Sequence, residues 1–281
     1  MNAIEVRGLR KEFDGFSLGP VNLTLPSGCI MGLIGENGAG KTTLIKLLMG
    51  AMKPSGGSVC VLGERDLRRR PAVKEEIGVV LAEPCFPEEI TAAELGIVLA
   101  HSYARWDAEA YKAYLERFEL PRDKKFKDFS RGMKMKLAIA AALSHRSKLL
   151  VLDEPTSGLD PVVRDTMLDL FFEFTREEDH SILISSHIVS DLEKLCDYVA
   201  FLHKGTLLLS EEKDRLLERY GLYRCTQAEL DALPPGALKG KRVGSYGVEA
   251  LVDREKMPGG AALQSPGLED VIVYMSKGGR P

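Results

Sequence analysis

The sequence predicts an α/β fold with a central parallel sheet, and three observations support this prediction. A glycine-rich turn at Gly35–Thr42 lies between an apolar run and a segment with helical spacing. A fully apolar stretch, Leu149–Leu152, suits a buried strand and ends in an acidic pair, Asp153 and Glu154. Between these two features, residues 84–145 change to a helical pattern. Polar groups at the ends of buried strands are typical of the ligand side of an open α/β sheet.

The glycine-rich turn has the composition of a phosphate-binding loop. Gly35, Gly38 and Gly40 allow the backbone to turn successive N–H groups inward, where they can bind an anion. The helix predicted for the residues from Lys41 onward adds the positive end of its dipole. In this setting the ammonium of Lys41 reaches the β- and γ-phosphates and the Thr42 hydroxyl binds Mg²⁺. A chance glycine-rich loop explains this pattern poorly.

The acidic pair and a later histidine supply candidate catalytic groups. Asp153 can hold Mg²⁺ directly or through water, and Glu154 can orient or deprotonate the water that attacks the γ-phosphate. The alternative is an acidic pair that caps a loop. His187 follows an apolar strand-like segment and two serines, and we expect it to donate to the γ-phosphate. The alternative there is a surface histidine or one satisfied by its neighbours.

A second phosphate site is predicted around Ser130. Ser130 is a good N-cap for a helix over Met133–Leu143, and a capped helix alone is the simpler interpretation. A hydroxyl, the small Gly132 and a helix N-terminus nevertheless form a phosphate site together. One molecule cannot easily place two such sites on a single γ-phosphate, whereas a head-to-tail partner can. This segment therefore favours a nucleotide held between two chains.

Taken together, residues 1–210 resemble an ATP-binding cassette (ABC) subunit, the nucleotide-hydrolysing half of an ABC transporter. The resemblance rests on Walker A at Gly35–Thr42, the signature at Phe129–Met133, Walker B at Leu149–Asp153 and the D-loop at Ser157–Asp160. It implies an α/β fold of the P-loop type with an antiparallel β subdomain and a helical subdomain. ATP and Mg²⁺ are the ligands that it implies. The site residues are Glu154 and His187 for catalysis; Phe13, Gly35, Asn37, Gly38, Gly40, Lys41, Thr42 and Thr43 for ATP; Ser130 and Gly132 in trans; Asp160 in the D-loop; and Thr42, Asp153 and Glu83 for the metal.

The resemblance also carries expectations about partners. Phe13 occupies the position where the family has an aromatic residue that stacks on adenine, although a lone Phe among hydrophobic neighbours is more often a core residue. The Ser-Arg-Gly-Met signature and the short C-terminal appendage look similar to exporter-type bacterial subunits. The resemblance implies an integral-membrane permease, a second ABC subunit in a homodimer or heterodimer, and a cytoplasmic position on the inner face of the cell membrane.

The sequence departs from the family pattern in two places. The usual signature is Leu-Ser-Gly-Gly-Gln, and Phe129, Arg131 and Met133 replace three of its five residues. The family also has a glutamine at the position of Ala82, where it contacts Mg²⁺. Ala82 offers no polar side-chain atom. Either Glu83 takes over this contact by a shift of one residue, or a water fills the place.

Composition limits the other classes of function. The formal net charge is −3, so bulk charge gives no attraction to nucleic acid, and no nucleic-acid partner is expected. No apolar stretch approaches the roughly 20 residues that a membrane helix needs. The five cysteines lack metal-site spacing and are interpreted as reduced thiols.

Two alternative functions remain open at this point. One is a soluble ABC ATPase that acts on ribosomes or nucleic acid, which usually has two cassettes or a long insertion. The other is a phosphotransferase that uses the same phosphate loop, which would need neither the Ser130 segment nor His187.

The predicted organisation has two parts. Residues 1–220 form the ABC ATPase domain, with half-buried antiparallel strands near its start and a helical subdomain over about 84–145. Its sheet is expected to close with a helix at Glu211–Arg219. Residues 221–281 form a small α/β appendage joined by a short linker, with a strand near Val248–Val252 and a helix at Leu268–Met275. This appendage is regulatory, stabilises a dimer, or has a passive packing role.

Overall fold

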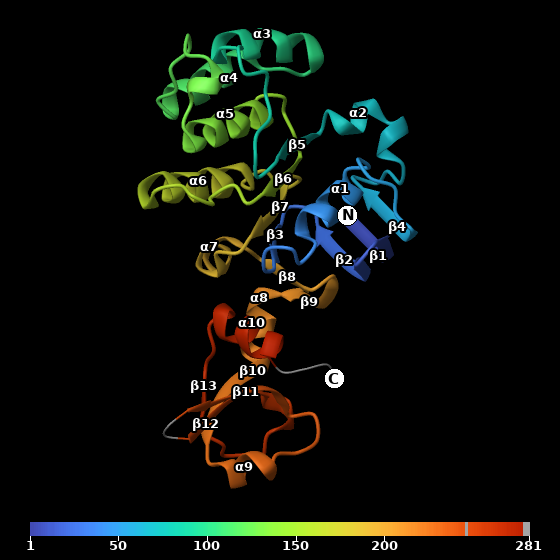
Figure 1. The fold of residues 1–281 in the computed structure, drawn as a ribbon, viewed down its shortest axis with the longest axis vertical. Coiled ribbons are helices and arrows are strands. Elements are labelled where there is room, and N and C mark those ends of the chain that lie inside the picture. The colour runs from blue at the N-terminus through green and yellow to red at the C-terminus, as the bar shows by residue number, and fades with distance from the viewer. Residues whose placement is uncertain (245–246, 278–281) are drawn as a thin grey trace.

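The structure is a computed structural model that describes residues 1–244 and 247–277, and its strands form three sheets (Figure 1). The central sheet has the strand order β5 (Ile77–Val80), β6 (Leu149–Asp153), β7 (Ser181–Ser186), β3 (Ile30–Ile34), β8 (Tyr198–His203) and β9 (Thr206–Glu212). Strands β5, β6, β7, β3 and β8 run parallel, while β9 is antiparallel to β8. Because β6, β7 and β3 are neighbours, the loops that follow them meet at one edge of the sheet.

The buried strands of this sheet confirm the predicted α/β fold. Strands β3, β6 and β7 are buried along their whole length, which explains the apolar runs that they contain. Strand β9 was not predicted, and the helix expected at Glu211–Arg219 begins only at Lys213. The sequence Leu207–Leu209 has no alternating pattern, so its pairing with β8 was not visible from periodicity.

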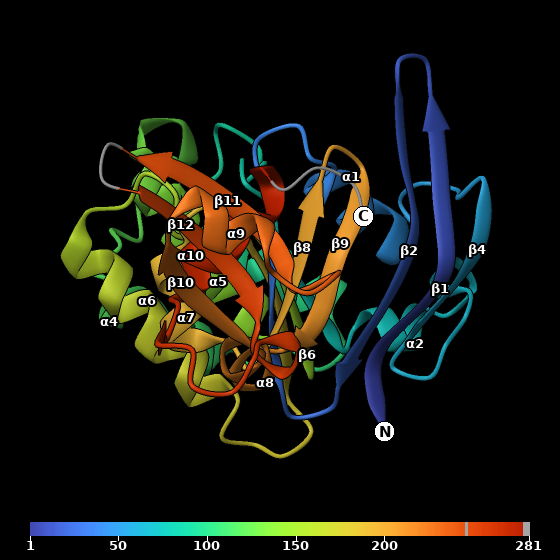
Figure 2. The ribbon, with the colours of Figure 1, turned by 90° about the horizontal axis from the view of Figure 1, so that it is seen from below.

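The N-terminal part forms an antiparallel sheet beside the central one. Its order is β2 (Phe16–Pro26), β1 (Asn2–Phe13) and β4 (Gly56–Val61). Apolar residues of β1 and β2 share one core cluster with α1 (Lys41–Leu48) and with β3. The hairpin of β1 and β2 extends along the side of the molecule (Figure 2). The predicted half-buried strands are therefore confirmed.

The middle of the chain is helical, as expected. A short helix, α2 (Pro71–Lys74), precedes β5, and three longer helices form the helical region: α3 (Ala92–Ser102), α4 (Ala108–Arg117) and α5 (Arg131–Leu143). Asp107 caps α4 by accepting the N–H of Ala110 at 3.0 Å. The buried rings of Tyr111 and Phe126 belong to the core cluster that these helices share with β6 and β7. The helical region lies at one end of the molecule, above α6 (Pro161–Phe174) in Figure 1.

The C-terminal part joins the rest without a linker. Helix α8 (Lys213–Arg219) is followed directly by β10 (Tyr220–Cys225), so the predicted short linker is wrong. Strand β10 belongs to an antiparallel sheet with the order β11 (Leu238–Gly244), β12 (Gly247–Asp253), β10 and β13 (Leu263–Gln264). The remaining helices are α9 (Gln227–Asp231) and α10 (Leu268–Lys277). Residues 245–246 and 278–281 of the predicted appendage lie outside the described residues.

Helix α10 returns to the nucleotide-binding part of the chain. Leu268 and Val271 are fully buried and share a core cluster with Leu192 and Leu195 of α7 (Val189–Leu195). The backbone N–H of Leu268 also donates to Oε1 of Glu193 on α7 at 3.1 Å. One apolar core therefore continues from the central sheet into the C-terminal part. Within the described residues, no helix combines the length and the apolar character that crossing a bilayer requires.

Candidate active site

The phosphate loop connects β3 to α1 and has the backbone that its glycines permit. Gly38 and Gly40 have φ values of +80° and +107°, a region that other residues rarely adopt. A Cβ added at Gly38 would meet no atom within 4 Å, so the space in front of this turn is open. Gly40 is the N-cap of α1, and the first N–H groups of a helix have no partner inside it. The loop therefore offers backbone donors and a helix N-terminus to an anion.

Lys41 is held at the centre of the loop. Its side chain is 6% exposed, and Nζ donates to the carbonyl of Gly35 at 2.6 Å. Nζ also lies 3.0 Å from Oε1 of Glu154. A buried ammonium requires a compensating charge, and the Glu154 carboxylate supplies it. The structure thus brings the predicted phosphate-binding lysine and the predicted catalytic carboxylate into contact.

Glu154 has an unusual backbone and two different oxygens. Its φ is +52°, which is uncommon for a residue with a Cβ, and its N–H donates to the carbonyl and hydroxyl of Ser185. Oε2 lies 2.6 Å from Nδ1 of His187. Oε1 is buried, and apart from the ion pair with Lys41 it makes no hydrogen bond to any described residue. The site therefore contains a buried acceptor that can receive a proton from a water or a ligand.

Asp153 and Thr42 form the oxygen-rich edge of the site. The Thr42 hydroxyl donates to Oδ2 of Asp153 at 2.7 Å, and Asp153 is 1% exposed. Hydroxyl and carboxylate oxygens are the ligands that Mg²⁺ prefers, so these residues fit that ion. Ser185 donates to the other oxygen, Oδ1.

Ser185 is a residue of the site for which the sequence predicted no role. The pairing of β6 with β7 places Asp153 directly opposite Ser185. Strand order and register decide this juxtaposition, and the sequence contained no signal for either. The serine is fully buried and contacts the two acidic residues of the site through one hydroxyl.

The third predicted metal ligand, Glu83, follows β5. Ala82 and Glu83 lie in a bend after β5, the edge strand of the central sheet, and Glu83 is exposed. None of the hydrogen bonds or ion pairs of the described residues joins Glu83 to Thr42 or Asp153. The one-residue shift therefore remains a prediction.

Phe13 lies near the end of the β1–β2 hairpin. Its side chain is 42% exposed, so the interpretation as a core residue is wrong. Its ring packs against Phe16, with 6.2 Å between the centroids. A Cβ added at Gly40 would lie 3.1 Å from the Phe16 ring, which shows that the hairpin touches the phosphate loop. The exposed ring of Phe13 is therefore separated from the phosphate loop by the ring of Phe16.

The remaining ATP residues belong to the loop and the start of α1. Asn37 is exposed in the turn, and Thr43 is half-buried in the first turn of α1. Neither residue takes part in a side-chain hydrogen bond within the described part of the chain. Their roles stay predictions.

The signature and the D-loop are neighbours within this chain. Ser130 caps α5 and accepts the N–H of Met133 at 3.3 Å, as the simpler interpretation expects. A Cβ on Gly132 would lie 3.3 Å from the side chain of Leu159. Asp160 caps α6 by accepting the N–H of Val163 at 3.0 Å. No hydrogen bond or ion pair of the described residues connects this group to Lys41 or the phosphate loop.

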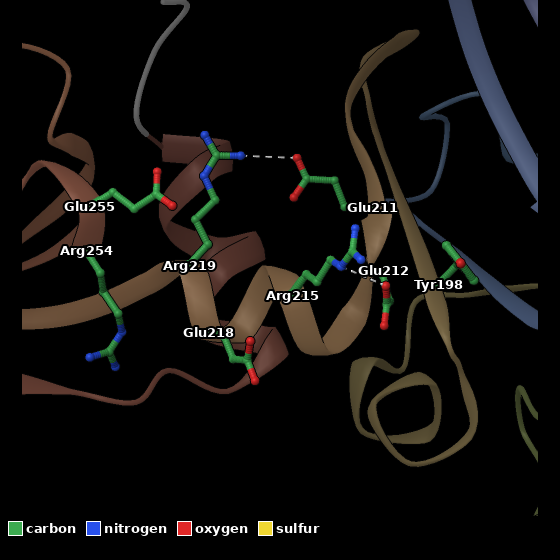
Figure 3. Close-up of a pocket in the computed structure, with 8 residues that line it drawn as sticks. All are labelled: Tyr198, Glu211, Glu212, Arg215, Glu218, Arg219, Arg254 and Glu255. Carbon is green, nitrogen blue, oxygen red and sulfur yellow. Dashed lines mark hydrogen bonds and ion pairs between the residues drawn. The ribbon is translucent and has the colours of Figure 1, made fainter.

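A hollow of about 570 Å³ lies elsewhere, between α8 and the 3₁₀ turn at Arg254–Lys256 (Figure 3). Arginines and glutamates from both sides line it, and two pairs are joined as Arg219 with Glu211 and Arg215 with Glu212. Because four glutamates face three arginines in this hollow, and because it contains no residue of the phosphate loop, we do not assign the nucleotide to it.

Comparisons with known proteins agree with the site geometry. A family model described as ABC transporter matches residues 18–157. The ABC transporter ATP-binding protein YtrB of Bacillus subtilis (strain 168) is 34% identical over 218 residues, which cover 77% of this chain and 74% of that protein. The bacitracin transport ATP-binding protein BcrA of Bacillus licheniformis is 37% identical over 209 residues, or 74% of this chain and 68% of that protein.

Two further matches extend this result. The Nod factor export ATP-binding protein I of Rhizobium sp. (strain N33) is 30% identical in an alignment that covers 98% of this chain and 97% of that protein. A solved structure of an ATP-binding subunit of an ABC transporter has a TM-score of 0.70 at 28% identity, over 77% of this chain and 92% of that chain. The alternative of an ABC ATPase that works without a transporter is not favoured by these relatives. The chain belongs to the ABC transporter family and is one of its ATP-binding, ATP-hydrolysing subunits.

Proposed function

We propose that the chain powers a separate integral-membrane permease of the exporter type. The names of two relatives support this direction, because they refer to bacitracin transport and to Nod factor export. The Ser-Arg-Gly-Met signature at Ser130–Met133 is a second reason. The subunit then works at the inner face of the cell membrane, paired with a second ABC subunit that is either identical or different. No nucleic acid takes part.

The observation that carries the catalytic proposal is the position of Glu154 between Lys41 and His187. Its two carboxylate oxygens lie 3.0 Å and 2.6 Å from the respective nitrogens. A carboxylate held at both oxygens has a fixed orientation, which general-base catalysis requires. When ATP enters, Lys41 exchanges part of this contact for the β- and γ-phosphates. Oε1 of Glu154 then accepts a proton of the attacking water.

His187 completes this arrangement. Its Nδ1 holds Oε2 of Glu154, while Nε2 takes part in no hydrogen bond with a described residue. Because the side chain is 46% exposed, Nε2 of the imidazolium form, in which both ring nitrogens carry a proton, can donate to an oxygen of the γ-phosphate. His187 therefore links the base to the group that is transferred.

Thr42 and Asp153 would hold Mg²⁺, which supplies positive charge that neutralises the β- and γ-phosphate oxygens. Ser185 keeps the Asp153 carboxylate in one orientation. Glu83 adds an oxygen at the edge where the family has glutamine and this chain has Ala82. The rest of the nucleotide is held by the loop with Asn37 and Thr43, and by the exposed ring of Phe13, which stacks on adenine.

Two cassettes close head to tail around the nucleotide. Ser130 and Gly132 of one chain complete the phosphate shell of the other, and Asp160 supports the contact at the D-loop. Hydrolysis removes the phosphate that joins the two halves, so they separate and the permease changes conformation. We assign residues 1–220 to this ATPase domain and residues 221–281 to an accessory domain that packs against it.

The Glu154→Gln variant tests the catalytic proposal. The amide keeps the shape but cannot accept the proton, so turnover should fall by about 10²- to 10⁴-fold. Binding of ATP, measured by equilibrium titration, should persist because the phosphate loop is intact. Glu116→Gln, on an exposed position of α4, is the control and should keep full activity. Unchanged turnover of Glu154→Gln would remove Glu154 from the mechanism, and loss of ATP binding would reduce its role to a structural one.

A further inference from the structure

The carboxylate of Asp191 joins three segments that lead away from the active site. Asp191 lies in the first turn of α7 and is 2% exposed. Its Oδ2 accepts the hydroxyl proton of Thr156 at 2.9 Å. Its Oδ1 accepts from Nε of Arg164 and also forms an ion pair with Nη2 of the same guanidinium. Arg164 in turn donates to the hydroxyl of Ser190 at 3.1 Å.

Each group of this network is close in sequence to a residue of the proposed site. The separations are two or four positions, so each pair lies within about one turn of the backbone. The pairs are Thr156 with Glu154, Arg164 with Asp160, and Asp191 with His187. One carboxylate therefore connects the turn after Walker B, the helix after the D-loop and the helix after the switch histidine.

The burial of Asp191 explains why this connection is firm. A buried carboxylate is stable only when it is paired and its oxygens accept hydrogen bonds. Here both oxygens are used, one by a guanidinium and one by a hydroxyl. Arginine and carboxylate groups match in geometry, so this pair fixes direction as well as distance. If one of these segments shifted, Asp191 and Arg164 would separate and a buried charge would be left uncompensated.

We infer that Asp191 is a positioning residue for ATP hydrolysis, acting through Glu154 and His187. This inference rests on the roles proposed for those two residues. Their contact of 2.6 Å joins two loops from different strands, and both loops must keep their places for it to persist. A misplacement of about 1 Å can reduce catalysis about 100-fold. Asp191 keeps the two loops in register.

The Asp191→Asn variant tests this inference through kcat and KM separately. The amide keeps the size of the side chain but loses the charge that pairs with Arg164. We expect kcat to fall by about 10- to 100-fold while KM for ATP changes less than about threefold, because the network does not include the phosphate loop. Asp165→Asn is the matched control, since Asp165 is an exposed neighbour of Arg164 on α6. It should keep both parameters.

A double-mutant comparison separates positioning from general stability. In a Glu154→Gln background, Asp191→Asn should reduce the residual rate by less than about twofold, because the group through which it acts is already lost. An equal fall in both backgrounds would overturn the inference, as would an unchanged kcat or a rise in KM alone. If Glu154→Gln itself is fully active, the proposed function and this inference fail together. If Glu154→Gln is inactive and Asp191→Asn is fully active, only this inference fails.

A second pair of variants keeps the test decisive if Asp191→Asn does not fold. Thr156→Val removes one hydroxyl and leaves the ion pair of Asp191 with Arg164 intact. It should lower kcat, and Thr156→Ser should restore it because the hydroxyl returns. Full activity of Thr156→Val, or no recovery in Thr156→Ser, would overturn the inference.

Discussion

Replacing Ser185 with alanine tests how the metal-binding edge is held. The hydroxyl of Ser185 donates to Oδ1 of Asp153, while Oδ2 of Asp153 accepts from Thr42. Ser185 is therefore the group that fixes the orientation of the proposed magnesium ligand. Ser185→Ala removes this donor and leaves the backbone of β7 unchanged, including the carbonyl that accepts the N–H of Glu154.

Losing this hydrogen bond should change two quantities, the stability of the chain and its affinity for Mg²⁺. A hydrogen bond to a charged group contributes about 1.5–3 kcal/mol to the free energy of unfolding. In a chain of this size, each kcal/mol shifts the thermal midpoint by about 2–4 °C, so the midpoint should fall by several degrees. The loss of a partner behind a metal ligand typically lowers metal affinity by about 10- to 100-fold. The Mg²⁺ concentration for half-maximal ATPase rate should rise by that factor.

The neighbouring serine provides a matched control for this experiment. Ser186 is equally buried, but its hydroxyl accepts the N–H of Ile188 at 2.9 Å and does not contact Asp153. Ser186→Ala should lower stability modestly and leave the Mg²⁺ dependence unchanged. The assay is ATPase rate against Mg²⁺ at fixed ATP, beside thermal unfolding without metal. Equal Mg²⁺ dependence of the two variants would refute the reasoning.

Three further predictions concern other parts of the chain. Leu268→Ala should lower the free energy of unfolding by about 2–5 kcal/mol, because this fully buried side chain joins α10 to α7. Val243→Ala, at an exposed position, is the control and should change the free energy of unfolding by less than about 0.5 kcal/mol. Similar values for the two variants in urea titration would contradict the shared core. Burial lowers the pKa of His145 below its ordinary 6.5, so the unfolded chain binds more protons below pH 6.5 and the free energy of unfolding should fall as the pH is lowered through that window. His145→Gln should flatten this dependence in denaturation curves, and an unchanged slope would assign it to other groups. Ala82→Gln should change the Mg²⁺ dependence of ATPase activity, and no change would mean that Glu83 or a water already compensates.

Most of the site was predictable because its motifs are local. The phosphate loop, the acidic end of β6 and the cap of α5 are each contained in a few consecutive residues, and glycine, carboxylate and serine have definite chemical roles there. The contact of Glu154 with Lys41 and His187 followed once β6, β7 and β3 were neighbours in a parallel sheet. The sequence therefore predicted the chemical groups of the site, and the strand order determined which of them lie close together.

What the sequence could not predict depends on register and on distant packing. Ser185 faces Asp153 only because β6 and β7 pair in one register, and one position of slip would turn that serine away. The hydrogen bond from Thr156 to Asp191 spans 35 residues. The packing of α10 on α7 joins segments more than 70 residues apart in the sequence, as the hydrogen bond from Leu268 to Glu193 shows. Composition suggested an appendage there, and the packing of α10 joins this part of the chain to the core of the preceding part.

The most direct test of the account is the mass of the Glu154→Gln chain in solution with ATP and Mg²⁺, measured by size-exclusion chromatography with light scattering. The account predicts that ATP doubles the mass, that omission of ATP returns it to one chain, and that adding Ser130→Ala prevents the doubling while ATP still binds. A chain that stays single at saturating ATP, even with its permease present, would contradict the claim that the nucleotide joins two cassettes.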